Sequence, residues 1–245
     1  MRVKSRIIVL VILFLILGNL WGIDCLAAEL DEKKTVYLTF DDGPSLNTDD
    51  ILAILNEKQV VASFFIIGDL ADKNEKIFNL ICESKMDIFP HTYSHDYSKI
   101  YTDLNAYYTD LMRCSELIKY KNSGEYTFIR LPGGTGNENL PKSLKNEILS
   151  KVPGEKCYFI DWTVDSGDTM RAVVDSSEIK SNISKYSGER KVEVVLMHDL
   201  LTKKSTVQSL SWIIDYYKER GYEFKLLSQI TEEEIQYLKS IDVIK

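Results

Sequence analysis

Histidine, cysteine and proline are scarce in this sequence, which has three, four and five of them among 245 residues. Five prolines and twelve glycines are too few for a fibrous or disordered chain, so we expect a globular fold. Beyond the N-terminal region the cysteines are Cys82, Cys114 and Cys157, an odd number without the spacing of a metal motif. We therefore expect buried thiols rather than a disulfide framework.

The sequence also lacks an excess of basic charge, with 30 basic against 37 acidic residues and a net charge of -7. The first 27 residues carry Arg2, Lys4 and Arg6 against Asp24, a balance of +2, so the remainder carries -9. Nucleic-acid binding depends on phosphate contacts from Lys and Arg. An acidic body therefore argues against nucleic acid as a partner.

The N-terminal segment has the layout of a secretory signal. Its basic residues precede an unbroken apolar run at 7–17, and the small residues Ala27 and Ala28 precede an acidic stretch. The alternative is an uncleaved membrane anchor, for which the run is short. We expect residues 1–28 to be a signal peptide or N-terminal membrane anchor and 29–245 to form one domain. Both alternatives place that domain outside the cytoplasm, either secreted or anchored to the outer face of the cell membrane.

Expected strands and helices alternate along the rest of the chain. The strands are expected at 36–40, 60–67, 86–89, 126–130, 157–162, 192–197 and 222–227, and the helices at 49–57, 72–84, 103–120, 141–150, 176–186 and 205–220. Such alternation predicts an α/β fold of parallel strands joined by crossover helices. About seven units fit a single distorted (β/α)7-8 barrel of mostly parallel strands, with its chemistry at the C-terminal strand ends.

All three histidines lie at or just past the end of an expected strand. His91 and His95 are four residues apart, a spacing that places two side chains on one face of a helical turn. Two neutral imidazoles at that spacing can bind one divalent ion. The adjacent Asp41 and Asp42 end the first strand, and either aspartate could supply the third ligand of a zinc site.

Further polar residues lie at other strand ends. Arg130 ends one strand, His198 ends another, and Asp161, Asp165 and Asp168 cluster at the end of a third. A surface charge or a turn accounts for each of them separately. Their common position at one end of a barrel favours a functional site.

Five segments in order resemble the motifs of the polysaccharide deacetylases of carbohydrate esterase family four. They are Thr-Phe-Asp-Asp-Gly-Pro at 39–44, His-Thr-Tyr-Ser-His at 91–95, Arg-Leu-Pro-Gly-Gly at 130–134, Val-Asp-Ser-Gly-Asp at 164–168 and Val-Leu-Met-His-Asp at 195–199. The similarity extends over about residues 35–227, so it implies that 29–245 is a polysaccharide deacetylase catalytic domain. The sequence departs from the family at Thr169, where tryptophan is usual, and at Pro90, where a polar residue is usual.

The resemblance implies a role for each matching residue at the reacting centre. Asp42, His91 and His95 would hold a divalent metal, zinc by default, although cobalt or nickel would suit the same donors. Asp41 would be the general base that takes a proton from the attacking water. Arg130 would pair with Asp41 and keep it oriented and ionised.

The resemblance also implies the parts that handle the leaving group and the acetyl group. His198 would be the general acid that protonates the departing amine, and Asp168 would orient it and raise its pKa. Leu196 would line the pocket for the acetyl methyl group. The backbone N–H of Gly133 would help to stabilise the oxyanion, and Trp162 would supply the aromatic wall in place of the missing tryptophan.

The activity implied is metal-dependent hydrolysis of N-acetyl groups on an N-acetylglucosamine polysaccharide, peptidoglycan or chitin-like, by a monomer that releases acetate. One alternative is an O-acetyl polysaccharide esterase of the same family, acting for example on acetylxylan. Another is an inactive wall-binding homologue, which predicts the loss of a ligand or of the base. A glycosidase has less support, because Asp41 and Asp42 are adjacent, whereas glycosidase carboxylates flank the bond roughly 5–10 Å apart.

Overall fold

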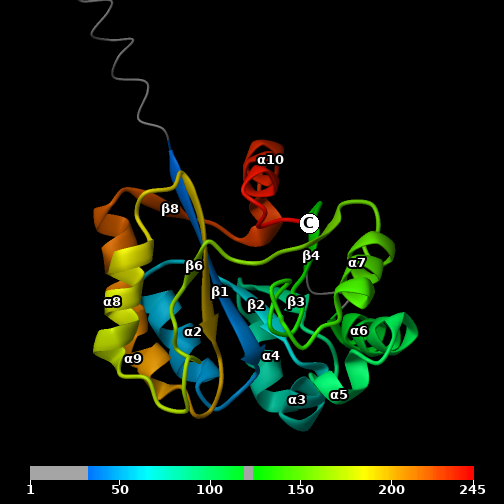
Figure 1. Ribbon diagram of the computed structural model, residues 1–245. Helices are drawn as coiled ribbons and strands as arrows, with labels where there is room; N and C mark the ends of the chain where they lie inside the picture. Colours follow the sequence, from blue (N-terminus) through cyan, green and yellow to red (C-terminus); the bar gives the residue numbers. More distant parts are fainter. Residues whose placement is uncertain (1–32, 119–123) are drawn as a thin grey trace, which may run out of the picture. The chain divides into compact units, whose positions relative to one another are not determined.

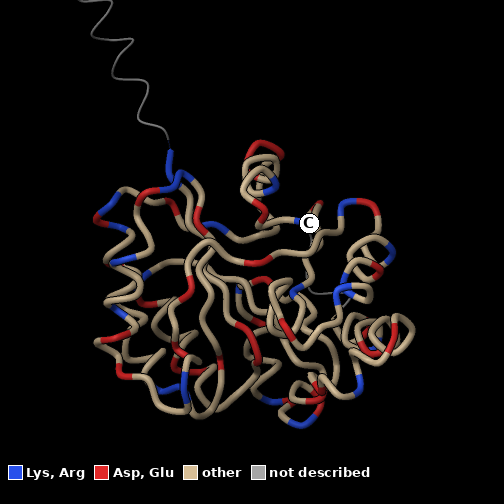
Figure 2. The backbone as a smooth tube through the Cα atoms, in the orientation of Figure 1, with Lys and Arg blue, Asp and Glu red and all other residues tan. Residues whose placement is uncertain are grey.

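The computed structural model describes residues 33–118 and 124–245, and residues 34–245 form one compact unit (Figure 1). The expected signal peptide or anchor at 1–28 lies outside the described residues. Within the described ranges, no helix is long and apolar enough to cross a membrane. Basic and acidic residues are interspersed around this unit (Figure 2).

A larger parallel sheet has the strand order β3-β2-β1-β7-β6. The central strand pairs with β7 along most of its length, while β8 pairs with its start and β2 with its end. The bounds are β1 Lys34–Gly43, β2 Ser63–Ile66, β3 Asp87–Pro90, β6 Val164–Asp165, β7 Val192–His198 and β8 Tyr222–Phe224. The expected fold of mostly parallel strands is therefore confirmed.

A second, two-stranded parallel sheet contains β4 (Thr127–Ile129) and β5 (Cys157–Phe159). It lies beside β3, where the Phe89 and Phe128 rings meet edge to face at 5.6 Å. Among the described strands, hydrogen-bonded pairing lapses between β3 and β4 and between β5 and β6. The expected distorted barrel is thus open at these two places.

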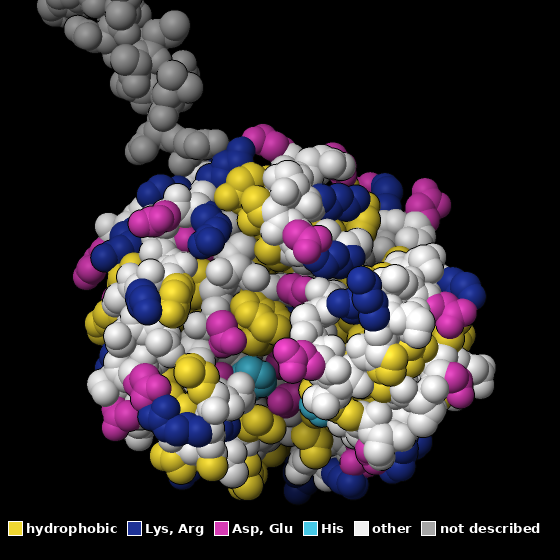
Figure 3. Space-filling view, viewed as in Figure 1, with side chains coloured by type: hydrophobic (Ala, Val, Ile, Leu, Met, Phe, Trp, Pro, Cys, Tyr) yellow, Lys and Arg dark blue, Asp and Glu magenta, His cyan; other side chains and the backbone are white. Residues whose placement is uncertain are grey.

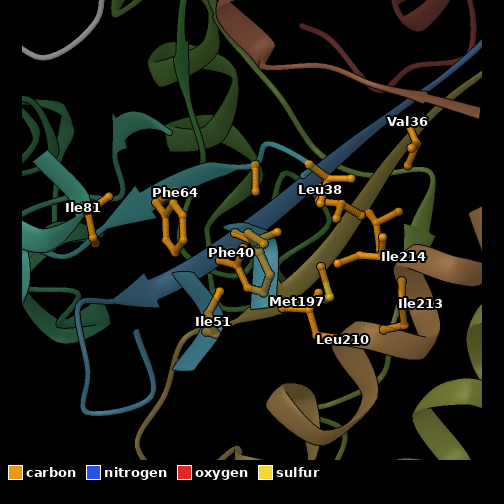
Figure 4. Close-up of a cluster of buried hydrophobic side chains, with 14 of the residues drawn as sticks. Val36, Leu38, Phe40, Ile51, Phe64, Ile81, Met197, Leu210, Ile213 and Ile214 are labelled. Atoms are coloured by element: carbon orange, nitrogen blue, oxygen red, sulfur yellow. The ribbon is translucent and has the colours of Figure 1, made fainter. Parts of the chain in front are cut away.

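Alternate residues of β1 serve two hydrophobic cores because successive side chains point to opposite faces. Leu38 and Phe40 pack toward the helices, where Phe40 stacks on Phe64 at 5.2 Å (Figure 4). Tyr37 points to the other side, into a core with Phe65. Each fully buried apolar side chain contributes about 1.5–3 kcal/mol, so this strand is a stable base for the residues at its end.

The helices cover the sheets in chain order. They are α2 Thr48–Glu57, α3 Gly68–Lys73, α4 Glu75–Glu83, α5 Tyr97–Ile100, α6 Leu104–Ile118, α7 Lys142–Lys151, α8 Ser176–Tyr186, α9 Lys204–Glu219 and α10 Glu232–Ser240, with a 3-10 turn at Leu227–Gln229. The core in Figure 4 lies between β1, β7 and the helices α2 and α9.

Several expected elements differ from the structure. The single helix expected at 72–84 is wrong: α3 and α4 meet at Asn74, whose φ of -124° and ψ of 47° are not helical. The strand expected at 60–67 is shorter, and β8 ends at Phe224. The sequence reading missed the short α5 and β6, and also α10, although Thr231 and Glu234 form a readable capping box there. Of the cysteines expected to be buried, Cys114 is buried but Cys82 and Cys157 are only half-buried, and none of the three forms a disulfide.

Candidate metal centre and active site

The end of β1 turns two adjacent carboxylates toward one pocket. Asp41 pairs with Phe65 and Gly43 pairs with Ile66, so Asp42 is an extra residue in a β-bulge, with φ at 69°. In a regular strand, neighbouring side chains point to opposite faces. The bulge redirects Asp42, so that Asp41 and Asp42 both line the same cavity.

His91 is held in one orientation by the backbone of β4's end. Its Nδ1 lies 2.8 Å from the carbonyl oxygen of Arg130, a partner that only accepts, so Nδ1 carries the proton. The unprotonated Nε2 lies 3.4 Å from Asp42 Oδ1. His95 Nε2 lies 3.3 Å from the same oxygen. Two imidazoles therefore converge on one carboxylate oxygen.

The helical turn expected for residues 91–95 is wrong. These residues form a loop in which Thr92 and His95 have φ of 67° and 51°. Tertiary contacts hold it: the Asp110 side chain accepts hydrogen bonds from the backbone N–H groups of Tyr93 and Ser94. The two imidazoles share one site because of these contacts and not because of helical spacing.

The donor set fits a divalent metal. The ligand atoms of Asp42, His91 and His95 lie within 4.8 Å of one another. Asp42 Oδ1 is buried and has no hydrogen-bond partner among the described residues, an unfavourable state that a bound cation would relieve. Burial opposes the charge of Asp42, but the nearby histidines outweigh burial and hold its pKa well below the usual range. Burial and the neighbouring His91 lower the pKa of His95, which favours the neutral, ligating imidazole.

Asp41 stands beside this triad with a different partner. Its Oδ1 accepts a hydrogen bond from Arg130 Nη1 at 2.9 Å, and its Oδ2 is 3.9 Å from His91 Nε2. Arg130 is fully buried, and its other donors bond to Thr39 Oγ1 and to the carbonyl oxygens of Ile160 and Asp161. The guanidinium is thus locked in place, so Asp41 is oriented while one of its oxygens remains turned toward the pocket.

His198 lies directly across from Asp41, because the two are register partners between β7 and β1. Its Nδ1 lies 2.7 Å from Asp168 Oδ1, and its backbone N–H donates to Asp168 Oδ2 at 2.8 Å. Thr206 Oγ1 donates to that same oxygen. Burial opposes a positive His198, but the hydrogen bond and charge of Asp168, with the charges of Asp42 and Asp41, raise the pKa of His198 to about 9.

A cavity of about 490 Å³ joins these groups, and Figure 3 shows histidine and acidic side chains gathered in a hollow of this face. Gly133, Leu196 and Trp162 all line the cavity, as does Thr169. Trp162 therefore stands where an aromatic wall was expected, with its ring against Gly134.

The strand-end aspartates of residues 161–168 have separate positions. Asp168 holds His198, as described, while the Asp161 carboxylate accepts hydrogen bonds from the backbone N–H and hydroxyl of Thr135. Asp165 Oδ1 accepts from the N–H of Gly167 and lies outside the cavity of the metal centre. Of the three, only Asp168 touches a residue predicted to take part in chemistry.

Pro90 does not disturb the metal loop. It is the last residue of β3 and pairs with Ile66, to whose carbonyl oxygen the N–H of His91 donates at 2.9 Å. In a parallel pair alternate residues donate to the same neighbour. The missing N–H of Pro90 therefore points away from β2, at the end strand of the larger sheet, where proline is tolerated.

The sequence reading missed three residues of the site. Tyr97, on α5, lines the cavity with its ring 5.5 Å from that of His95. Lys203 is 6% exposed, and its Nζ donates to the carbonyl oxygens of Arg171 and Ala172, which fixes the loop after β6. Asp199 was quoted only as the last residue of a motif. It is fully buried and accepts hydrogen bonds from Ser45 and Thr48, which positions the loop after β1.

Comparisons with known proteins agree with this arrangement. A family model described as polysaccharide deacetylase matches residues 29–148. The solved catalytic domain of a peptidoglycan N-acetylglucosamine deacetylase from Eubacterium rectale is 30% identical, with a TM-score of 0.71 over 81% of this chain and 91% of that one. The chain belongs to the polysaccharide deacetylase family. A peptidoglycan-N-acetylglucosamine deacetylase of Bacillus cereus is 29% identical over 202 residues, which cover 79% of this polysaccharide deacetylase and 69% of that protein.

A third relative extends the range of substrates named among these proteins. A chitooligosaccharide deacetylase of Bradyrhizobium is 27% identical to this polysaccharide deacetylase over 223 residues, covering 82% of this chain and 93% of that protein. Deacetylation of a glycan is thus common to the names of these relatives, while the glycan differs.

Proposed function

We propose that this protein hydrolyses N-acetyl groups on an N-acetylglucosamine-containing polysaccharide, peptidoglycan or chitin-like, and releases acetate. The observation that carries the proposal is the division of two adjacent carboxylates. Asp42 Oδ1 lies between two imidazoles, 3.4 and 3.3 Å away, whereas Asp41 is held by Arg130. One carboxylate is placed to ligate and the other to take a proton. The relatives named as N-acetylglucosamine and chitooligosaccharide deacetylases support the choice of an amide substrate.

A divalent ion held by Asp42, His91 and His95 would act as a Lewis acid on the acetyl carbonyl and make the attacking water more acidic. Zinc is the ion we propose, because two imidazoles and a carboxylate with room for a further ligand are typical of catalytic zinc, although cobalt and nickel suit the same donors.

The residues beside the triad carry the proton to and from the reacting carbon. Asp41 accepts a proton from the attacking water as the new C–O bond forms, and Arg130 keeps that carboxylate aimed at the cavity. The backbone N–H of Gly133 donates to the oxygen that gains negative charge. His198 then gives a proton to the nitrogen as the C–N bond breaks, so the products are acetate and an amino sugar.

The pocket walls and the leaving group fit this sequence of events. An amine is a poor leaving group unless it is protonated, so a separate acid is required. His198 meets this need because Asp168 holds its Nδ1 and keeps the imidazole charged. Leu196 and Trp162 supply apolar surface for the acetyl methyl group.

Acetate release is the direct test. The purified protein is incubated with N-acetylglucosamine oligomers, peptidoglycan and acetylxylan, with a chelator and after re-addition of zinc. We expect release from an N-acetylated glycan that the chelator stops and zinc restores. Release from acetylxylan alone would make the protein an O-acetyl esterase, and bound metal without release from any glycan would make it an inactive wall-binding homologue.

We further propose that residues 1–28 direct export, and that the protein acts as a monomer outside the cytoplasm, secreted or held at the outer face of the membrane. The basic residues and apolar run of this segment support export. N-terminal sequencing of protein recovered from the producing cell tests cleavage, since an intact N-terminus would favour an anchor. Gel filtration with light scattering tests the monomer.

Replacing His198 by alanine is expected to slow amide hydrolysis more than hydrolysis of an activated ester. A nitrophenolate leaves without protonation, whereas an amine does not, so loss of the acid should cost about 10²–10⁴-fold on the amide and less than about tenfold on 4-nitrophenyl acetate. The two kcat/KM ratios measure this difference. Equal losses on both substrates would refute the role of His198 as acid.

Replacing Asp168 by asparagine is expected to move the alkaline limb of the rate profile. A general acid acts when protonated, so activity is present below its pKa and is lost as pH rises through that value, which is about 9 for His198. Without the Asp168 charge the pKa falls, and the limb should move to lower pH by about 1–2 pH units. Thr206→Val is the matched control, because it removes one hydrogen bond to Asp168 but leaves the charge. An unchanged limb in Asp168→Asn would show that His198 does not govern it.

A further inference from the structure

A second cavity, of about 510 Å³, shares Trp162 with the pocket of the metal centre. The loop that follows β6 forms one of its walls, and residues of α8 and the turn after it form another. The proposed chemistry uses none of its residues except Trp162. This cavity therefore lies next to the reacting centre without a role in it.

The loop between β6 and α8 separates the two cavities. Thr169 and Arg171 line the first, whereas Gly167 and Met170 line the second. Gly167 has φ of 71°, and a Cβ there would lie 2.4 Å from Asn182 Nδ2, so the loop rests directly against α8. A ligand longer than one sugar that passes over this loop would contact both cavities.

The lining of the second cavity suits a sugar ring. Trp162 and the half-exposed Tyr186 offer aromatic surface, which packs well on the apolar C–H face of a pyranose. Asn182 donates from Nδ2 to the carbonyl oxygen of Ser166 at 3.1 Å, which leaves its own carbonyl oxygen to accept. Apolar surface with a few polar groups is the usual composition of a small-molecule site.

The charged groups of the cavity favour a neutral, hydroxylated ligand. Arg190 donates from Nη1 to the carbonyl oxygen of Tyr186 at 3.3 Å, and its other N–H groups have no printed side-chain acceptor in the described chain. Asp165 lines the same cavity with the opposite charge. One cation and one anion offset each other, while together they supply donors and acceptors for hydroxyl groups.

We propose that this second cavity binds a neighbouring sugar ring of the glycan chain whose acetamido group lies at the metal centre. The inference rests on the proposed function and adds to it that the substrate is an oligomer or polymer, held by at least two of its sugars. Trp162 would contact the glycan from both cavities.

The test is a chain-length series of N-acetylglucosamine oligomers from dimer to hexamer, assayed by acetate release. In the wild-type protein KM should fall as the oligomer lengthens. In Tyr186→Ala and in Arg190→Met, KM for the hexamer should rise about fivefold while the dimer changes less than about twofold, because each variant removes one contact to the outer sugar. Tyr108→Ala is the matched control, since Tyr108 is 46% exposed on α6 and Tyr186 is 50% exposed on α8.

Binding provides a readout that does not depend on turnover. Titration calorimetry of the hexamer against Asp41→Asn, with and without Tyr186→Ala, should show weaker binding in the double variant by the same factor. Thermal unfolding identifies any variant that fails to fold, and Arg190→Met keeps the test open if Tyr186→Ala does.

The outcomes separate this inference from the proposed function. Acetate release with the same chain-length dependence in wild type and in both variants overturns the second sugar site and leaves the proposed function intact. Wild-type protein that releases no acetate from any oligomer overturns the proposed function. Hexamer binding that is insensitive to Tyr186→Ala and Arg190→Met overturns the second site whether or not turnover is seen.

Discussion

Asp41→Asn is expected to abolish turnover while the metal stays bound. The substitution keeps the size of the side chain and an oxygen that can accept from Arg130 Nη1, but it removes the group that takes the proton from water. General-base catalysis contributes about 10²–10⁴-fold, so kcat should fall by at least that factor on N-acetylglucosamine oligomers. Metal content measured by atomic emission should stay near that of the wild type, because Asp42, His91 and His95 are untouched.

Two controls make the result specific. Asp50→Asn changes an exposed carboxylate on α2 and should leave kcat unchanged. Thermal unfolding is needed as well, since Arg130 is fully buried and loses its charged partner in Asp41→Asn. A folded Asp41→Asn protein that retains metal and near-normal activity would show that another group is the base.

His91→Ala is expected to lose both metal and activity. His91 is 2% exposed, and its ring is fixed between the carbonyl oxygen of Arg130 and Asp42 Oδ1, so no neighbouring side chain can take its place. With one of three protein ligands removed, we expect metal affinity to fall by at least about 100-fold, since even changes outside the ligand set cost about 10–100-fold. Competition with a chromogenic chelator measures the affinity, and acetate release measures the activity.

His198→Ala is the matched control for this second prediction. It removes the chain's third histidine, which lies outside the donor triad, and should leave metal affinity unchanged. If His91→Ala bound metal as tightly as His198→Ala, the site of the metal would have to be sought elsewhere. If both variants lost metal equally, His198 would belong to the ligand set and not to the acid.

The two substitutions test different parts of one arrangement. Asp41→Asn separates proton transfer from metal binding, whereas His91→Ala removes both. The separation is meaningful because the bulge at Asp42 gives adjacent carboxylates different partners. A site in which both carboxylates ligated the ion would lose metal in Asp41→Asn as well.

Much of the fold could be predicted from local patterns. The apolar runs and amphipathic periods placed most strands and helices, and their alternation predicted parallel pairing. The break between α3 and α4 at Asn74 could not be predicted, because residues on both sides continue a helical pattern. The two-residue β6 was missed because an element that short has no periodicity.

The sequence by itself determined which chemical groups are present and that they fall at strand ends: three histidines, adjacent aspartates and one arginine, in five motifs in a recognisable order. Only the tertiary structure decided which atoms meet. The bulge turned Asp42 to the histidines, tertiary contacts and not a helical turn shaped the loop of His91 and His95, and strand register set His198 across from Asp41. These outcomes depend on contacts between segments far apart in the chain, and no local pattern of residues encodes them.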